Sequence, residues 1–414
     1  MRRESPHSRA VRSGGPGTGA PVSPTPRERD ATLLVALALS VAFTCCPLRA
    51  MESAAEQSLA TEFDGWFRQQ ASEERLVGAA FAIVSRDRVV HIGTHGHTDA
   101  SRKRAIDADT AFRVASVSKT FTAGLVAQLV AEGRFRWADP VVEYVPDFRI
   151  KGDTSKIRIE HLLGQSSGLV PHAYDNLIED GVPVDQIRLR LAELAPTCTP
   201  GSCYSYQNTV FSLIEPIVER AAADSYANLV EQRIFRPLRM DHASIGYERF
   251  LATPNRAEPH VKRKGEWRQV DVLPNYYTVA PAAGVNASTL DMAKWLMAQL
   301  GANPQVVRPE AVESLIAPRV RTPRDLYRKE WKRILTDAHY GLGWRVYQLG
   351  EERIVYHSGW VSGYRADVAW SPAHGLGIAV LMNVEGSSIN ALTTRFWELA
   401  FEKLALQRGA PASP

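Results

Sequence analysis

Ser116 and Lys119 form the only Ser-x-x-Lys pattern in the chain, and these two residue types together are suited to nucleophilic catalysis. A serine hydroxyl is a weak nucleophile until a base removes its proton. A lysine is such a base only when its pKa falls well below about 10.4, which burial and neighbouring cations achieve. Residues 116–133 are apolar on most faces of a helix, so we expect the lysine to be buried one turn from the serine. The alternative is a helix-capping serine followed by a lysine that extends to the surface.

The segment Phe112-Arg-Val-Ala-Ser-Val-Ser-Lys119 resembles the nucleophile segment of class C β-lactamases, D-alanyl-D-alanine carboxypeptidases and related esterases. The resemblance implies a Tyr-x-Asn element, followed by Lys-Thr-Gly or His-x-Gly on a strand near the C-terminus. The chain has Tyr206-Gln-Asn208 and then His357-Ser358-Gly359, in the family's order. The similarity extends over residues 60–400 in outline. Its supporting segments are His161-Leu-Leu163, Ser167-Gly-Leu169, Pro281-Ala-Ala-Gly284, Asp291-Met-Ala-Lys-Trp295 and Tyr340-Gly-Leu-Gly-Trp344.

The family's roles pass to the matching positions of this chain. By resemblance, Ser116 is the nucleophile, and Lys119 and Tyr206 share the proton transfer. Asn208 holds the lysine and the substrate amide, while His357, Ser358 and Gly359 bind substrate on a strand end. The oxyanion hole is implied to use the backbone amides of Ser116 and Trp360. Trp360 departs from the family, where this position is small, so we expect its side chain to narrow the site.

Other segments compete for these roles. Tyr174-Asp-Asn176 and Tyr226-Ala-Asn228 also match Tyr-x-Asn, but the first lies in a polar stretch and the second inside an expected helix. Ser166 lies in Gly164-Gln-Ser-Ser-Gly168, a nucleophile-elbow pattern without the strand and helix that this motif requires.

His91, His95 and His97 cluster without the Cys or carboxylate pattern of a zinc site. We find no phosphate-binding glycine loop or dinucleotide fingerprint, so we expect no metal or organic cofactor.

Strand-like runs lie near both chain ends, at 77–84, 89–94, 343–349, 353–357, 363–370 and 376–383. The middle has mostly helical periodicity, with a capping-box pattern that begins at Ser288. We therefore predict an α/β (α+β) fold with an antiparallel sheet built from both chain ends, flanked by helices, and a mostly helical inserted subdomain. This domain is expected over residues 51–414, with the helical part over about 136–279 between α/β parts over about 51–135 and 280–414.

The chain carries a net charge of +4, but residues 1–50 contain seven Arg and three acids, so the remainder is balanced. This balance argues against nucleic-acid binding. Residues 1–30 are predicted to be a disordered extension. Residues 31–50, with an apolar run flanked by Arg27 and Arg29, are predicted to be a signal peptide. We expect a periplasmic or secreted protein that meets the membrane only through this segment; the alternatives are an uncleaved anchor or a lipidated Cys45.

Export makes a local disulfide the expected state of Cys198 and Cys203, which bracket a Pro-Gly turn. Two unpaired surface thiols are the alternative.

Taken together, the motifs predict a serine hydrolase that forms a covalent acyl-serine on β-lactam or D-Ala-type peptide amide bonds, so its partner is a small-molecule or peptide substrate. His357 in place of Lys is similar to the D,D-peptidases and esterases of the family rather than to most class C β-lactamases. The alternatives are an esterase of the same family and a penicillin-binding or scaffold protein that does not turn over.

Overall fold

An eight-stranded antiparallel sheet runs through the computed structural model, which describes residues 54–407. The strand order is β2-β1-β13-β12-β11-β10-β9-β8, so strands from the two ends of the chain meet where β1 pairs with β13. This arrangement confirms the predicted fold class. The strands are β1 (Gly78–Val84), β2 (Val89–Gly96), β8 (Val320–Arg321), β9 (Asp337–Tyr340), β10 (Arg345–Leu349), β11 (Glu352–Val361), β12 (Tyr364–Ser371) and β13 (Leu376–Met382).

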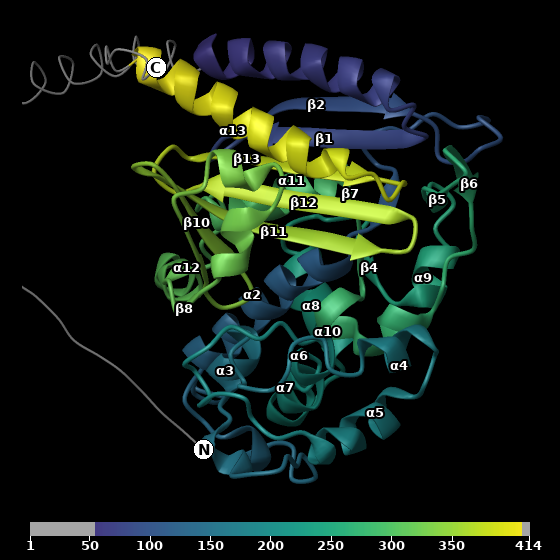
Figure 1. Ribbon diagram of the computed structural model, residues 1–414. Coiled ribbons are helices and arrows are strands. Elements are labelled where there is room, and N and C mark those ends of the chain that lie inside the picture. Colours follow the sequence, from purple (N-terminus) through teal and green to yellow (C-terminus); the bar gives the residue numbers. More distant parts are fainter. Residues whose placement is uncertain (1–53, 408–414) are drawn as a thin grey trace, which may run out of the picture. The chain divides into compact units, whose positions relative to one another are not determined.

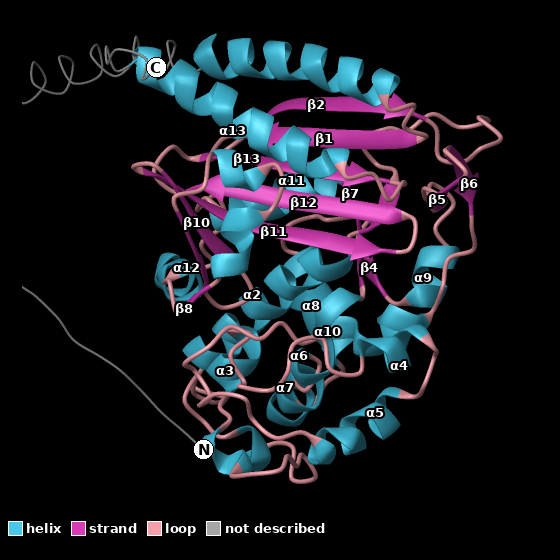
Figure 2. Cartoon of the chain, in the orientation of Figure 1, coloured by secondary structure: helices cyan, strands magenta, loops and turns pink. Residues whose placement is uncertain are grey.

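Helices cover both faces of this sheet (Figures 1 and 2). On one face, the helix over residues 54–73 lies beside α13 (Ser388–Gln407). The ring centroids of Phe63 and Phe396 lie 5.5 Å apart between these two helices. Alternate residues of β1 divide between the two faces: Phe81 packs in the core under these helices, and Ala82 packs in the core on the opposite side. Burial on both faces explains why β1 and β13 are apolar throughout rather than alternating.

The opposite face packs against the helical middle of the chain. Its helices are α2 (Ser118–Ala131), α3 (Ile159–Leu163), α4 (Asp175–Glu179), α5 (Val184–Arg190), α6 (Asn208–Phe211), α7 (Ile214–Ala222), α8 (Tyr226–Val230), α9 (Tyr247–Leu251), α10 (Ala280–Ala283), α11 (Thr289–Gln299) and α12 (Pro309–Ile316). The predicted capping box is present, because Ser288 and Asp291 bond reciprocally at the start of α11. Short strands interrupt the helices: β3 (Ala111–Arg113), β7 (Val285–Ser288) and β4 (Ser244–Ile245) form a small sheet, and β5 (His260–Arg263) pairs with β6 (Glu266–Gln269).

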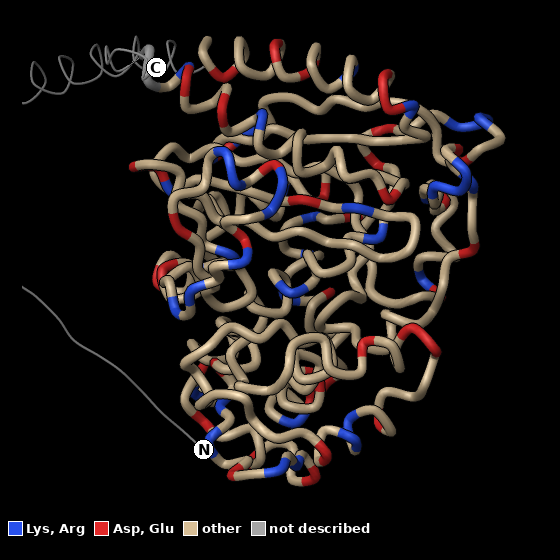
Figure 3. The backbone as a smooth tube through the Cα atoms, viewed as in Figure 1, with Lys and Arg blue, Asp and Glu red and all other residues tan. Residues whose placement is uncertain are grey.

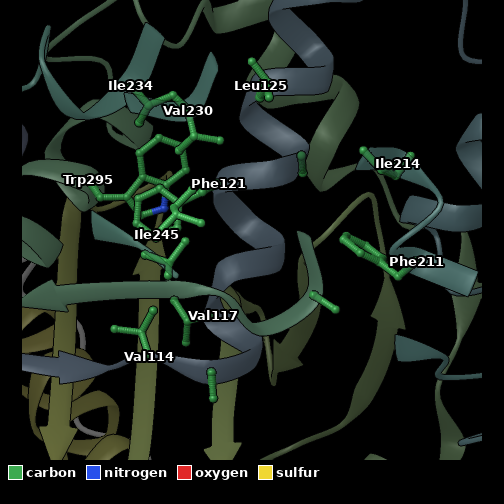
Figure 4. Close-up of a cluster of buried hydrophobic side chains, with 14 of the residues drawn as sticks. Val114, Val117, Phe121, Leu125, Phe211, Ile214, Val230, Ile234, Ile245 and Trp295 are labelled. Atoms are coloured by element: carbon green, nitrogen blue, oxygen red, sulfur yellow. The ribbon is translucent and has the colours of Figure 1, made fainter. Parts of the chain in front are cut away.

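Helix α2 lies at the centre of this second core and is buried on nearly all sides. Figure 4 shows Phe121 and Leu125 of α2 among apolar side chains of the surrounding elements, with Trp295 of α11 beside Phe121. The rings of Phe121 and Trp295 stack at 4.4 Å, and Gly124 leaves room for the same indole. A helix that is apolar all round needs such surroundings, so α2 is a rigid support for residues at its N-terminus.

Charged residues of both signs are interleaved along the chain in Figure 3. Among the described residues, no helix combines the length and apolar character that crossing a membrane requires. The predicted N-terminal extension, signal peptide and Cys45 lie outside the described residues.

Candidate active site

Ser116 lies in a short 3-10 turn, η1 (Ala115–Val117), that joins β3 to α2. The residue before it, Ala115, has φ of +48°, a left-handed backbone that costs a non-glycine residue on the order of 1–3 kcal/mol. Such strain persists only where the surroundings impose it. Here β11 packs against η1. The turn leaves Ser116 half-buried at the start of a buried helix.

Lys119 is fully buried one turn further along, which excludes the surface-extended alternative. Its Nζ lies 3.1 Å from Ser116 Oγ, 2.8 Å from Asn208 Oδ1 and 3.0 Å from the Ala282 carbonyl oxygen. Burial lowers the pKa of Lys119 to about 7, although the Asp175 carboxylate opposes this effect; Arg345 adds to the lowering. A lysine with this pKa is substantially neutral at physiological pH and can accept a proton from the serine.

Tyr206 completes this group, with its ring centroid 4.7 Å from Lys119 Nζ. Burial raises the pKa of the Tyr206 phenol, and a hydrogen bond with the Ser116 side chain partly offsets this rise. The structure therefore brings together the predicted serine, lysine, tyrosine and asparagine from two separate segments of the chain, 116–119 and 206–208.

The competing tyrosines lie in other hydrogen-bond networks. The Tyr174 hydroxyl donates to the Arg190 carbonyl at 2.9 Å, and the Tyr226 hydroxyl lies 2.8 Å from Thr122 Oγ1 inside the helical core. Ser166 follows helix α3 instead of the strand that a nucleophile elbow requires.

Cys198 and Cys203 form a disulfide just before the Tyr206 element. The loop they close packs on the Ser166 segment: the Gly201 amide donates to the Ser166 carbonyl at 2.7 Å, and Gly168 lies against the Cys198 carbonyl oxygen. The Ser205 amide then donates to the Gln165 carbonyl at 2.7 Å. The pattern that resembles a nucleophile elbow thus forms part of the support under Tyr206.

His357, Ser358 and Gly359 lie within β11, whereas the sequence placed them at the end of a strand. The strand continues because β12 pairs with β11 as far as Val361. On the other side, pairing with β10 stops at Tyr356, before His357. An extended substrate can pair with the backbone beyond this point.

Gly359 is required for the close approach of the nucleophile turn. A β-carbon at this position would lie 2.1 Å from the Val114 carbonyl oxygen and 3.2 Å from the Ala115 β-carbon. Because side chains alternate along a strand, Trp360 lies on the opposite face of β11 from this contact. There it is 63% exposed and lies 5.5 Å from the Arg365 guanidinium. Its ring is therefore directed away from the turn that carries Ser116. The narrowing of the site that we expected from the size of this side chain does not follow from this placement.

His357 is buried, with Nε2 3.0 Å from the Tyr340 hydroxyl and Nδ1 2.9 Å from the Ser358 carbonyl oxygen. Burial lowers the pKa of His357 well below its usual value, and the positive charges of Arg345 and Lys119 lower it further. His357 is therefore a neutral hydrogen-bonding group near neutral pH.

Sequence analysis missed three residues that lie beside the predicted group: Arg345, Asp175 and His172. Arg345 directly follows the Tyr340–Trp344 segment and forms an ion pair with Asp325. Its guanidinium carbon lies 5.6–5.9 Å from the ring centroids of Tyr204, Tyr206 and Tyr340.

Asp175 is the middle residue of the Tyr174-Asp-Asn176 triplet that had been considered only for its tyrosine, and its Oδ2 lies 3.0 Å from Asn208 Nδ2 and 2.8 Å from His172 Nδ1. The contact with Asn208 joins residues 33 positions apart in the sequence, and no local pattern marks it.

Within residues 54–407, no group of three or more His, Cys, Asp and Glu side chains has an arrangement able to hold a metal ion. Of the clustered histidines on β2, His91 lies 3.5 Å from Asp64.

The sequence model of the family described as Beta-lactamase matches residues 63–400. Among curated relatives, Unguisins hydrolase ungD from Aspergillus violaceofuscus (strain CBS 115571) is 24% identical over 378 residues, covering 84% of this chain. The present chain spans 66% of that relative's length, slightly under two thirds.

Two solved structures share the fold. The octameric penicillin-binding protein homologue from Pyrococcus abyssi has a TM-score of 0.72 and 24% identity, covering 85% of this chain and 78% of its own. A D-stereospecific amidohydrolase from Streptomyces sp. has a TM-score of 0.64 and 22% identity, covering 83% of this chain and 98% of its own.

Proposed function

Since the chain belongs to the β-lactamase family, a family of serine hydrolases, we propose that it hydrolyses an amide or ester bond through an acyl group carried on Ser116. The observation that supports this most directly is the 3.1 Å contact between Ser116 Oγ and the buried amine of Lys119. A buried lysine whose pKa is lowered to about 7 is a base suited to neutral pH.

In the proposed acylation step, Lys119 and Tyr206 take the proton from Ser116 Oγ while Oγ forms a bond with the substrate carbonyl carbon. The backbone N–H groups of Ser116 and Trp360 stabilise the resulting oxyanion. When the tetrahedral adduct collapses, the bond to the leaving nitrogen or oxygen breaks, and Tyr206 returns the proton to the leaving group. Water, deprotonated by the same pair, then forms a bond with the acyl carbon; the bond from this carbon to Ser116 Oγ breaks, the proton returns to Oγ, and the acid leaves.

For the substrate, we propose a β-lactam or a D-Ala-type peptide amide. The three sequence motifs of the class C-like members support this assignment. The unpaired edge of β11 beyond Tyr356 also supports a substrate with an extended peptide-like backbone. The names of the similar proteins supply two further substrates to test, a D-residue amide and an unguisin.

An esterase is the second candidate, and His357 is the observation that favours it. A substrate carboxylate is best held by a cation, but His357 is neutral near pH 7 and is already hydrogen-bonded to Tyr340. An uncharged ester makes no demand for a positive charge at this position.

We also propose export to the periplasm or the cell exterior. The Cys198–Cys203 disulfide supports this location, because such bonds persist in oxidising compartments.

The proposed function is tested by incubating the purified chain with a fluorescent penicillin and a small chromogenic ester, and following intact mass over time. Ser116→Ala is expected to abolish the adduct and the turnover, while the matched control Ser166→Ala retains both. An adduct that clears within seconds indicates a β-lactamase, and one that lasts for hours indicates a penicillin-binding peptidase or a protein without turnover. Ester turnover without a penicillin adduct supports the esterase. Labelling that survives Ser116→Ala contradicts the proposal.

A further inference from the structure

Three polar side chains connect the protein surface to Lys119. His172 is exposed, and its Nδ1 lies 2.8 Å from Asp175 Oδ2. The same carboxylate oxygen accepts a hydrogen bond from Asn208 Nδ2 at 3.0 Å. On the other side of its amide, Asn208 Oδ1 accepts from Lys119 Nζ at 2.8 Å. Asn208 is thus held between a carboxylate and the catalytic amine.

The Asp175 carboxylate determines which way the Asn208 amide faces. An ionised carboxylate only accepts hydrogen bonds, so it requires the NH₂ end of the amide. The oxygen is then directed toward Lys119. If the amide turned over, its oxygen would face the carboxylate and its NH₂ would face the amine, and both hydrogen bonds would be lost.

Opposite charges flank Lys119. Asp175 favours the protonated form of Lys119 and raises its pKa, whereas Arg345 lowers it; burial is the largest effect, and the result is about 7. The other titratable groups that interact with Lys119 are Tyr206 and His357.

Asp175 also interacts with groups on a neighbouring element. Besides His172, it interacts with Tyr276 of η6 (Asn275–Val279), whose hydroxyl donates to Glu179 at 3.0 Å.

The loop that carries this group is held in an unfavourable conformation. His172 and Tyr174 both have a left-handed backbone, with φ of +57° and +66°, a conformation that is unfavourable for residues other than glycine. The His172 amide donates to the Tyr206 carbonyl at 2.7 Å, and the two rings lie 5.4 Å apart. The Tyr206 segment therefore imposes the loop geometry that brings Asp175 to Asn208.

We propose that Asp175 is a positioning residue for the acyl-transfer reaction: it fixes the Asn208 amide against Lys119 and places a negative charge close enough to hold a proton on the lysine. His172 holds the other side of the same carboxylate from the surface. The proposal rests on the proposed function, because it concerns the base for Ser116.

The test measures kcat/KM from pH 5 to 9 with whichever probe, the fluorescent penicillin or the small ester, labels Ser116 in the wild-type chain. The acid limb of this profile, where kcat/KM falls as pH decreases, reports the pKa of the base in the free enzyme. Asp175→Asn retains a hydrogen-bond acceptor but loses the charge, so its acid limb is expected to shift down by on the order of one pH unit. Asp175→Glu keeps the limb near the wild-type position. The matched control is Asp180→Asn, an exposed aspartate at the other end of α4, which leaves the profile unchanged.

A uniform loss of rate in Asp175→Asn without movement of the limb indicates a merely structural residue and overturns the inference. Thermal melting establishes that each variant folds. If Asp175→Asn does not fold, Asp175→Gln, compared with the charged variant Asp175→Glu, decides the matter: loss of the carboxylate charge shifts the limb downward, and an unmoved limb overturns the inference. If the wild-type chain labels with neither probe, the proposed function fails, and this inference fails with it. If the wild-type chain labels and the limbs coincide, only the inference fails.

Discussion

Lys119 Nζ lies 3.1 Å from Ser116 Oγ, and the lysine side chain has no exposed surface. A protonated lysine there would be a buried cation without a carboxylate in direct contact, since its hydrogen-bond partners are the Ser116 hydroxyl, the Asn208 amide and the Ala282 carbonyl. Burial therefore favours the neutral amine, the form that accepts a proton.

The first prediction concerns pH. Because the pKa of Lys119 is lowered to about 7, the base is protonated below that pH, and kcat/KM should rise as pH increases through 7. Lys119→Arg keeps a permanent positive charge and should reduce kcat/KM by at least about 100-fold above pH 7, since a general base contributes about that much, and the deficit should shrink as pH falls and the wild-type lysine becomes protonated. A pH–rate profile of both proteins, with Lys156→Arg on the surface as the control, tests this. A wild-type profile that is flat from pH 5 to 9 would contradict the assignment of Lys119.

The second prediction concerns Gly359. A methyl group at this position meets the Val114 carbonyl oxygen at 2.1 Å, so Gly359→Ala must push β11 away from the turn that carries Ser116. We expect a loss of about 1–3 kcal/mol in the free energy of unfolding, together with a large fall in kcat. Gly65→Ala is the matched control: its β-carbon meets nothing within 4 Å, and in a helix the change should stabilise by up to about 1 kcal/mol. Denaturant titration and kcat are measured on both variants. If Gly359→Ala loses no more stability and no more kcat than Gly65→Ala, the predicted clash with Val114 is contradicted.

The third prediction concerns the disulfide. Closing the six-residue loop from Cys198 to Cys203 should stabilise the fold by about 2 kcal/mol on the chain-entropy model. Because this loop supports the segment that leads to Tyr206, Cys198→Ser with Cys203→Ser should also lower kcat/KM. A reducing agent should weaken the wild-type chain to the level of the double variant and leave the variant itself unaffected. Identical thermal melts with and without the reductant would show that the bond contributes nothing.

The fourth prediction concerns Asp367, which lies in the core between the sheet and α13. Burial raises its pKa to about 6, although Tyr356 and Thr393 donate hydrogen bonds to it. The folded state therefore holds this proton more tightly than the unfolded chain, whose aspartates titrate near 3.9. As pH rises from 4 through 6, the wild type should lose up to about 3 kcal/mol of stability from this group. Asp367→Asn lacks this loss, so its free energy of unfolding should improve relative to wild type between pH 4.5 and 7.5. Urea titrations at both pH values measure the difference, and a constant difference would contradict the raised pKa.

Much of the architecture was available from local patterns. The strands at both chain ends, the buried helix after Ser116 and the capping box at Ser288 follow from periodicity within short segments, and the structure confirms them. The family assignment, carried by the order of the three motifs, is confirmed by the match over residues 63–400. The domain boundaries and the roles of the site residues stay predictions. Predictions for residues 1–50 lie outside the described residues.

The sequence by itself determined the pairing of Ser116 with Lys119, because three residues along a helix always place two side chains on one side. Only the tertiary structure decided that Asp175 and Arg345 flank this lysine, since they come from a strained loop and a strand 56 and 226 residues away from it in the sequence. The same holds for Gly359 against Val114, whose contact depends on how β11 packs on the nucleophile turn. Spacing along the chain sets the local geometry of neighbouring side chains. The charges around a buried amine such as Lys119, however, depend on which distant segments the fold brings together.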